Sequence, residues 1–221
     1  EVSQTASSLA NSRELYASLT SRIANLMGGQ LCGILLYNES EHALISQPPF
    51  HGGVPDAFLE MYRISLPRNS LAAQMWMEND FWYTNDVQNN TLVAEAGLTY
   101  LAETVGVKPT LLAPLNVAGK RLGVVQVSNK LNGAPFDDSD ARLLKIYAGQ
   151  AAILIDNARL VRESDERAKR SEEIRLIAEI TGSSRPLADI YRDVVARIAN
   201  LLAIDFSIIL LLNEAKGELV P

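Results

Sequence analysis

The feature that most constrains the fold is a long stretch without proline that extends from Asp137 to Thr181. Asp137 can cap a helix at its start, and Asp138 and Asp140 place negative charge at the positive end of that helix. Gly149 is the only glycine within the stretch. A helix of this length would span on the order of 65 Å, which exceeds the width of a small domain. The stretch therefore predicts one continuous helix that begins in one domain and extends beyond it.

The predicted helix has two apolar faces with different uses. One has the spacing of a face that packs on a sheet, and its members are Leu144, Tyr147, Ala151, Leu154 and Ala158. The second repeats every seven residues, as in paired helices, with Arg167 interrupting the series Ile146, Ile153, Leu160 and Ile174. Asn157 would occupy an alternate position of that seam, where a buried amide fixes register at a cost in stability. The second face predicts either a homodimer through its helices or a merely amphipathic helix.

The sequence repeats itself at an offset of 175 residues, which places Tyr191 on Tyr16. Tyr16–Ile45 aligns on Tyr191–Val220 without a gap, and the pentapeptide Arg-Ile-Ala-Asn-Leu is identical in both copies. Such a match indicates a tandem duplication. We predict a first domain over residues 8–160, a helical linker over 161–182, and the N-terminal fragment of a second, truncated domain over 186–221.

Composition and charge exclude several classes of partner. The chain is 48% hydrophobic and 21% charged, which is typical of a globular protein. A net charge of -6 without a Lys- or Arg-rich run argues against nucleic acid or an anionic membrane surface. The longest apolar run, 206–212, is too short to cross a bilayer, and a single cysteine favours a reducing compartment. We expect a cytoplasmic location, with no nucleic-acid or membrane contact by this part of the chain.

The first domain has the order of elements expected of an α+β sandwich around an antiparallel sheet. Helical spacing predicts a first helix over 9–27 that ends at Gly28 and Gly29. Short helices are predicted over 56–62, 70–78 and 92–104. Strands are predicted over 31–37, 43–47, 81–84, 108–117 and 121–129, where the first two and the last two form hairpins.

The run APLNVAGKRLGVVQVSNKLNGAPFDDSDARLLKIYAGQAAILIDNARL closely resembles the second half of GAF domains, the ligand-sensing modules of bacterial signalling proteins and cyclic-nucleotide phosphodiesterases. The resemblance covers the first copy and the beginning of the second. It implies a six-stranded antiparallel sheet, with the first and last helices on one face, where dimers usually form. It also implies a ligand pocket on the other face, roofed by irregular helices. We therefore expect a sensory fragment whose long helix relays the state of this pocket to a downstream domain.

One pattern within the resemblance bears on the ligand. Asn129, Lys130, Phe136 and Asp140 match cyclic-nucleotide-binding members, but Ala141 stands where their pattern has Glu. Members that bind no cyclic nucleotide also have this pattern, and there a Lys130 to Asp140 pair would fasten the last hairpin to the long helix. Cyclic-nucleotide binding, a purely structural role, and a ligand-free dimerisation scaffold are all compatible with these residues.

The candidate ligand contacts are aromatic or uncharged polar side chains near the implied pocket. They are Asn69, Ser70, Trp82, Tyr83, Thr84, Asn85, Thr91, Tyr100 and Gln126. Ser70 and Thr91 lie at predicted helix N-termini, where they would either receive an anion or serve as caps only. Trp82 and Tyr83 would otherwise be core residues on the two faces of a strand. No arginine or lysine stands out near these positions to neutralise a cyclic phosphate.

The sequence contains few residues that could support catalysis or bind a cofactor. The two histidines, His42 and His51, lie in a predicted turn and a glycine-rich loop, which disfavours a metal site or a hydrolytic triad. Cys32 lies in an apolar strand, where we expect it to be a small buried hydrophobic residue. Some GAF relatives reduce methionine sulfoxide or attach a bilin through reactive cysteines, and this sequence offers no cysteine for either role. His51 is the only candidate haem ligand, which makes haem unfavourable. We expect a noncatalytic domain without a metal, whose ligand is a small molecule of unknown identity.

Overall fold

The structure, a computed structural model, describes residues 2–181, 187–204, 206–213 and 218–220. It forms two compact units, Glu1–Arg159 and Leu160–Pro221. The first unit contains six strands: β1 (Gly29–Asn38), β2 (Ala43–Ser46), β3 (Arg63–Ser65), β4 (Trp82–Thr84), β5 (Thr110–Val117) and β6 (Lys120–Lys130). They form one antiparallel sheet in the order β3-β2-β1-β6-β5-β4.

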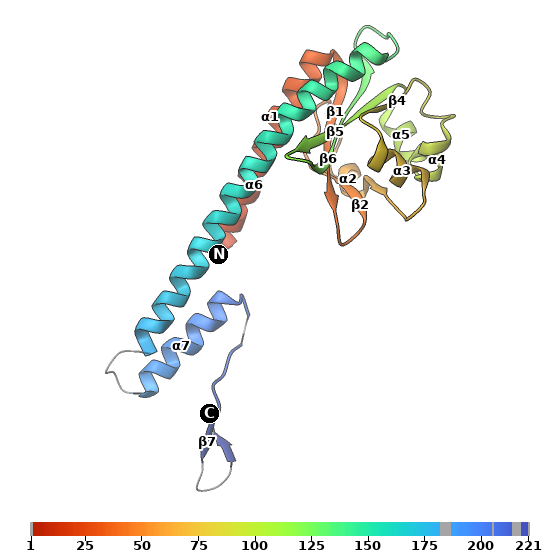
Figure 1. The fold of residues 1–221 in the computed structure, drawn as a ribbon. Coiled ribbons are helices and arrows are strands. Elements are labelled where there is room, and N and C mark those ends of the chain that lie inside the picture. The colour runs from red at the N-terminus through yellow and green to blue at the C-terminus, as the bar shows by residue number, and fades with distance from the viewer. Residues whose placement is uncertain (1, 182–186, 205, 214–217, 221) are drawn as a thin grey trace. The chain divides into compact units, whose positions relative to one another are not determined.

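Helices cover both faces of this sheet. On one face lie α1 (Val2–Met27) and the first part of α6 (Asp138–Thr181), which run alongside each other (Figure 1). On the other face lie the short helices α2 (Asp56–Met61), α3 (Leu71–Glu78), α4 (Thr91–Glu95) and α5 (Thr99–Val105). The predicted α+β sandwich with a six-stranded antiparallel sheet is confirmed. Among the described residues, no helix combines the length and the apolar character that a membrane span requires.

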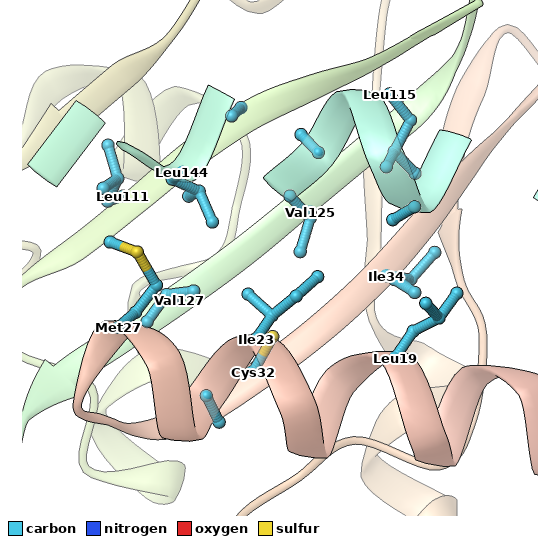
Figure 2. Packing of buried hydrophobic residues seen from close by; sticks show 14 of the residues in the cluster. Leu19, Ile23, Met27, Cys32, Ile34, Leu111, Leu115, Val125, Val127 and Leu144 are labelled. Atoms are coloured by element: carbon cyan, nitrogen blue, oxygen red, sulfur yellow. The ribbon is translucent and has the colours of Figure 1, made fainter. Parts of the chain in front are cut away.

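The larger core fills the space between the sheet and the pair α1 and α6 (Figure 2). Leu19 and Ile23 of α1 reach it from one side, and the fully buried Leu144 of α6 from another. The sheet contributes Ile34, Leu111, Leu115, Val125 and Val127. The buried positions of α6 also include four alanines, Ala141, Ala148, Ala151 and Ala152. These small side chains fill the core between the larger residues of the sheet and α1.

The sheet-facing stripe predicted for α6 is wrong at its end. Ile155 is buried there, whereas Leu154 is 49% exposed and Ala158 is exposed. The buried positions follow from Leu144 through Ala148 and Ala151 to Ile155, which is the 3.6-residue period of a straight helix. Leu154 departs from that period by one position, whereas Ala158 continues the period but lies exposed at the end of the first unit.

Two local predictions also need correction. The predicted helix over 92–104 is interrupted, because α4 ends at Glu95 and α5 begins at Thr99. Gly97 has a φ of 70° in this break, the left-handed conformation that ends helices. No strand was predicted at Arg63–Ser65, where β3 pairs with β2. Three residues are too few for the alternation that identifies a strand.

The second unit contains residues 160–181 of α6, followed by α7 (Leu187–Leu201), β7 (Leu211–Asn213) and β8 (Glu218–Val220). Its hairpin has the register of the first hairpin at the repeat offset. Leu211 pairs with Val220, as Leu36 pairs with Ile45 in the first unit. The sequence repeat is therefore accompanied by the same local strand pairing.

The ends of helices α1 and α7 correspond as well. Gly28 follows α1 with a φ of 62°, and Ala203 follows α7 with a φ of 52° at the equivalent position. A left-handed residue commonly ends a helix, and glycine adopts this conformation with the least strain. Residues 182 and 186, which bound the predicted linker and second domain, lie outside the described residues.

Candidate functional site

A cavity of about 120 Å³ lies between the sheet and the short helices α2 to α5. Strands β1, β5 and β6 contribute its floor, which consists of Leu31, Cys32, Gly33, Thr110, Leu112, Gln126 and Ser128. Apolar side chains of α2, α4, α5 and their ends form its roof: Phe58, Leu59, Leu92, Val93, Ala96, Leu98, Leu101, Ala102 and Val105. Among the described residues, its wall includes no charged side chain and no histidine.

Four side chains form a polar strip in this apolar wall: Tyr62, Thr110, Gln126 and Ser128. The Tyr62 hydroxyl donates to Gln126 Oε1 at 2.6 Å. Gln126 Nε2 donates to Thr110 Oγ1 at 3.0 Å and to Ser128 Oγ at 3.1 Å, and these two hydroxyl oxygens lie 2.9 Å apart. Only one hydroxyl hydrogen can lie between the two oxygens. The other can therefore donate to an acceptor inside the cavity.

The loop before α2 closes the cavity beside β1. Over its first residues β1 has no β2 partner, and Cys32 instead exchanges backbone hydrogen bonds with His51, at 3.2 Å and 2.8 Å. This bridge places the ring of Phe50 directly over Gly33, where an added Cβ would overlap the ring. Gly33 is therefore required by the close approach of an aromatic wall residue.

Cys32, the one thiol of the chain, borders the cavity, but its side chain belongs to the larger core beneath α1 and α6 (Figure 2). Its side chain is buried, with 1% of the residue exposed. Burial raises the pKa of the Cys32 thiol far above its ordinary value, because the anion would lose its hydration. The group is a neutral thiol at physiological pH, and a neutral thiol is a poor nucleophile.

The structure brings two of the nine predicted ligand contacts, Trp82 and Gln126, into the cavity wall. It places the other seven outside that wall: Asn69, Ser70, Tyr83, Thr84, Asn85, Thr91 and Tyr100. Tyr100 is 78% exposed on α5. Its helix turns that face to solvent, because Leu98, Leu101 and Ala102 take the positions over the cavity.

The two predicted helix starts are occupied by caps. Ser70 caps α3 by accepting a hydrogen bond from the backbone N–H of Ala73 at 3.1 Å. Asn69 precedes it with a φ of 65°, a conformation that asparagine tolerates better than most residues. Thr91 is the first residue of α4 rather than its cap, because Asn90 accepts the hydrogen bonds of the free backbone N–H groups.

Strand β4 directs its polar residues away from the cavity. The side chain of Tyr83 packs on the larger core, and its hydroxyl donates to Asp138 Oδ1 at 3.1 Å. Asn85 exchanges two hydrogen bonds with the backbone of Phe136, at 2.8 Å and 3.0 Å. Thr84 donates to the carbonyl oxygen of Asp86. These contacts attach the edge of the sheet to the start of α6.

The four residues of the cyclic-nucleotide pattern make contacts outside the cavity wall. Lys130 Nζ lies 2.6 Å from Asp140 Oδ2 and 5.6 Å from the centroid of the buried Phe136 ring. Asn129 accepts from the backbone of Lys108 and donates to the carbonyl oxygen of Gly106, both at 2.9 Å. The pattern therefore joins β6 to α6 and to the end of α5.

Of the polar strip, only Gln126 was predicted from the sequence; Tyr62 was missed, and so were the strand residues Thr110 and Ser128. They are polar side chains in apolar strands, and each is almost fully buried. Thr110 and Ser128 are paired across β5 and β6. A prediction of the register of this hairpin would therefore have placed the two hydroxyl side chains next to each other. Among the described residues, no group of three or more His, Cys, Asp or Glu side chains is arranged to hold a metal ion.

A curved antiparallel sheet with two long helices on one face, and short helices over a cavity on the other, defines an α+β sandwich domain. The family assignment follows from the sequence. The family model of the GAF domain matches residues 10–156, and the chain therefore belongs to the GAF domain family. The resemblance noted from residues 113–160 is confirmed.

Solved structures share the fold at low sequence identity. The GAF domain/HD domain protein from Geobacter sulfurreducens aligns with a TM-score of 0.56 and 15% identity, over 69% of this chain and 96% of that chain. A far-red cyanobacteriochrome photoreceptor gives 0.53 and 18%, over 71% and 92%. Residues 122 to 287 of a methyl-accepting chemotaxis protein give 0.53 and 18%, over 70% and 96%. At these identities the likeness concerns the fold.

Proposed function

We propose that the first unit is a noncatalytic sensory module of a signalling protein, which binds a small, largely apolar molecule in the cavity. The observation that carries this proposal is a largely apolar cavity with one polar strip, in which one hydroxyl hydrogen can donate to a ligand acceptor. Neighbours of the same fold include a photoreceptor and a chemotaxis protein, which is consistent with a sensory role.

The size and chemistry of the cavity favour an apolar ligand over a cyclic nucleotide. An apolar cavity of roughly 150 Å³ can hold benzene, and this one measures about 120 Å³. A cyclic phosphate would find no cation in the described wall of the cavity. The two charged residues of the family pattern, Lys130 and Asp140, pair with each other outside the cavity wall. A titration with cyclic AMP or cyclic GMP is expected to give no heat.

The sheet supplies a mechanical connection between the cavity and α6. Along β6, Gln126 and Ser128 face the cavity, while Val125 and Val127 belong to the core beneath α1 and α6. Successive side chains of a strand point to opposite faces. A ligand that shifts β6 through the polar strip would therefore move the core residues that α6 packs on. We propose that this movement is the signal that α6 carries.

Gentle mass spectrometry of the intact protein, purified from its own host, tests ligand binding. We expect a retained small molecule, together with its loss in the variant Ala96→Phe, whose ring would fill the cavity beneath the end of α4. Ala94→Phe is the matched control, because Ala94 is exposed on the same helix. Equal occupancy in both variants would place the molecule elsewhere. An empty wild-type protein that also binds no added benzene or indole would overturn the proposal.

We propose in addition that the module forms a homodimer through α6. Its seven-residue repeat is exposed within one chain: Ile146 at 59%, Ile153 at 51%, Leu160 at 49% and Ile174 at 56%. Asn157, also exposed, would lie in the same seam and fix its register. Apolar side chains in such a periodic row are stabilised by pairing with a second helix.

Light scattering of two matched variants tests the dimer. Ile153→Glu places a charge in the seam, while Leu154→Glu places one at a neighbouring position of nearly equal exposure, 49% against 51%. We expect the wild type and Leu154→Glu to be dimers and Ile153→Glu to be a monomer at the same concentration. A monomeric wild type at every workable concentration would contradict the proposal, as would a dimer that tolerates Ile153→Glu.

We also propose that residues 186–221 begin a second GAF domain, with residues 161–182 as its linker. The shared hairpin register and the left-handed residue after α7 support this assignment. If a longer natural form contains the rest of this second domain, its first strand should pair with its own last strand, as β1 pairs with β6 in the first unit. A structure of such a form with a different pairing would exclude a second copy.

A further inference from the structure

A β-bulge in β6 brings a cation to the cavity face of the sheet. Leu115 and Asn116 are consecutive in β5, but their partners on β6 are two residues apart, which leaves Leu122 without a partner on β5. Side chains beyond such a bulge change faces. Leu122 accordingly packs on the core beneath α1 and α6, and Arg121 lies on the opposite face, with the roof helices.

The requirement for Gly123 next to the bulge follows from the same geometry. A Cβ at Gly123 would overlap the carbonyl oxygen of Leu35 on the neighbouring strand β1. The glycine lets the two backbones approach where β6 is distorted. The position of Arg121 is therefore set by the backbone of the sheet rather than by its own flexible side chain.

Within the part of the chain that the structure describes, the groups that accept hydrogen bonds from Arg121 are all neutral. Its Nη1 donates to the carbonyl oxygens of Trp76 and, at 3.1 Å, Asn79, and its guanidinium carbon lies 5.7 Å from the centroid of the Trp76 ring. Nε and Nη2 have no described hydrogen-bond partner, and no described carboxylate pairs with the group. Asp80 pairs with Lys145 at 2.5 Å, and its pKa is lowered by that hydrogen bond and, to a smaller extent, by the charge of Arg121. Three N–H donors of a permanent cation thus remain available.

Arg121 lines a second cavity, of about 70 Å³, which adjoins the first. The two cavities are neighbours, because five residues line both of them: Ile64, Ala72, Trp82, Leu92 and Leu112. Arg121 is the only charged side chain among the described residues around the second cavity. A carboxylate there would receive two parallel N–H donors from the guanidinium, which is the strongest arrangement for such a pair.

We propose that the module recognises an amphipathic carboxylic acid, whose hydrocarbon body occupies the first cavity and whose carboxylate pairs with Arg121 in the second. The inference rests on the proposed function, because it requires the first cavity to bind a small molecule. It adds the class of that molecule and the residue that selects it. A neutral compound of the same shape would leave the guanidinium without its anion.

Isothermal titration with two pairs of probes tests the charge of the ligand. The probes are octanoate and hydrocinnamate, each compared with its own primary amide, which has the same shape and no charge. We expect the chain of residues 1–221 to bind each acid at least about tenfold more tightly than the amide, since a charge-assisted hydrogen bond contributes on the order of one such factor. Equal affinities for acid and amide would overturn the inference and leave the proposed function intact.

Variants of Arg121 test the residue itself. Arg121→Gln should lose the preference for the acid while its affinity for the amide stays unchanged, and Arg121→Lys should retain part of the preference. Arg142→Gln is the control, because Arg142 is exposed on α6 and the variant removes the same net charge. A preference that survives Arg121→Gln would exclude this residue. If neither acids, amides nor benzene bind to the wild type, the proposed function fails together with the inference.

Discussion

Lys130 Nζ lies 2.6 Å from Asp140 Oδ2, and both side chains are nearly buried, at 15% and 16% exposure. Lys130 ends β6, and Asp140 lies in the first turn of α6, so the pair joins the last strand to the long helix. Asp140 Oδ2 also accepts the backbone N–H of Asp137 at 3.0 Å. One carboxylate therefore both closes the start of α6 and attaches it to the sheet.

Disruption of this pair should destabilise the first unit. Because little water reaches either group, we expect Lys130→Met and Asp140→Asn to cost about 1–3 kcal/mol each, with a coupling energy of about 1 kcal/mol or more in a double-mutant cycle. Urea unfolding followed by tryptophan fluorescence measures this unit, since both tryptophans, Trp76 and Trp82, lie in it.

The exposed pair of Arg63 and Glu41 provides the control for this cycle. Its atoms lie 2.9 Å apart, but its side chains are 52% and 43% exposed. We expect a coupling energy below about 1 kcal/mol, because water screens the charges. Equal coupling energies for the two pairs would mean that burial does not strengthen the Lys130 to Asp140 contact.

The hydrogen bond between Tyr62 and Gln126 gives a second prediction. Gln126→Met should cost about 1–3 kcal/mol, since it leaves the Tyr62 hydroxyl, on a residue only 9% exposed, without its acceptor. Tyr62→Phe in the same protein should restore much of that stability by removing the unpaired group. Urea unfolding of the two single variants and the double variant measures this rescue. Additive losses would show that the hydroxyl finds another partner.

Local signals were sufficient to predict most of the secondary structure. The helix stop at Gly28, the cap at Ser70 and the start of α6 at Asp137 each depend on residues a few positions apart. Such signals act within one turn of backbone, so the sequence contains them in readable form. The continuous helix from Asp138 to Thr181 was predicted for the same reason.

The cavity could not be predicted in this way, because its parts come from distant segments. Tyr62 reaches Gln126 across 64 positions of sequence, and the Phe50 ring covers Gly33 only because its loop pairs with β1. The bulge that turns Arg121 toward the roof depends on the pairing of β5 with β6. Alternation of apolar residues shows no such shift of register.

Replacement of glycine by alanine should change the stability of the first unit in opposite directions at two positions. Gly123→Ala should destabilise the first unit by about 3 kcal/mol, because the new Cβ would overlap backbone atoms of β1 that cannot rotate away. Gly149→Ala should stabilise it by about 1 kcal/mol, because Gly149 lies within α6 with open space around it, and alanine is the better helix former. Urea unfolding measures both. A loss of stability in Gly149→Ala would indicate that a second chain packs against this position.

The start of α6 predicts how stability depends on pH. The Ser139 hydroxyl donates to Asp137 Oδ1 at 2.5 Å, and this bond, with the backbone N–H of Asp140, holds the pKa of Asp137 below its ordinary value. A carboxyl whose pKa is lower in the folded state stabilises that state above the unfolded pKa, about 3.9 for aspartate. This contribution is lost as the pH falls through the folded pKa.

Thermal unfolding of Asp137→Asn tests the sign. Asparagine can cap the helix without titrating, so the wild type should melt at a higher temperature than Asp137→Asn at neutral pH. The difference should shrink once the pH falls below about 4, as the carboxyl of Asp137 takes up a proton. Ser139→Ala removes the hydroxyl donor, which should raise the pKa of Asp137 and move the loss to higher pH. A difference in melting temperature that stays constant across this range would show that the charge of Asp137 does not stabilise α6.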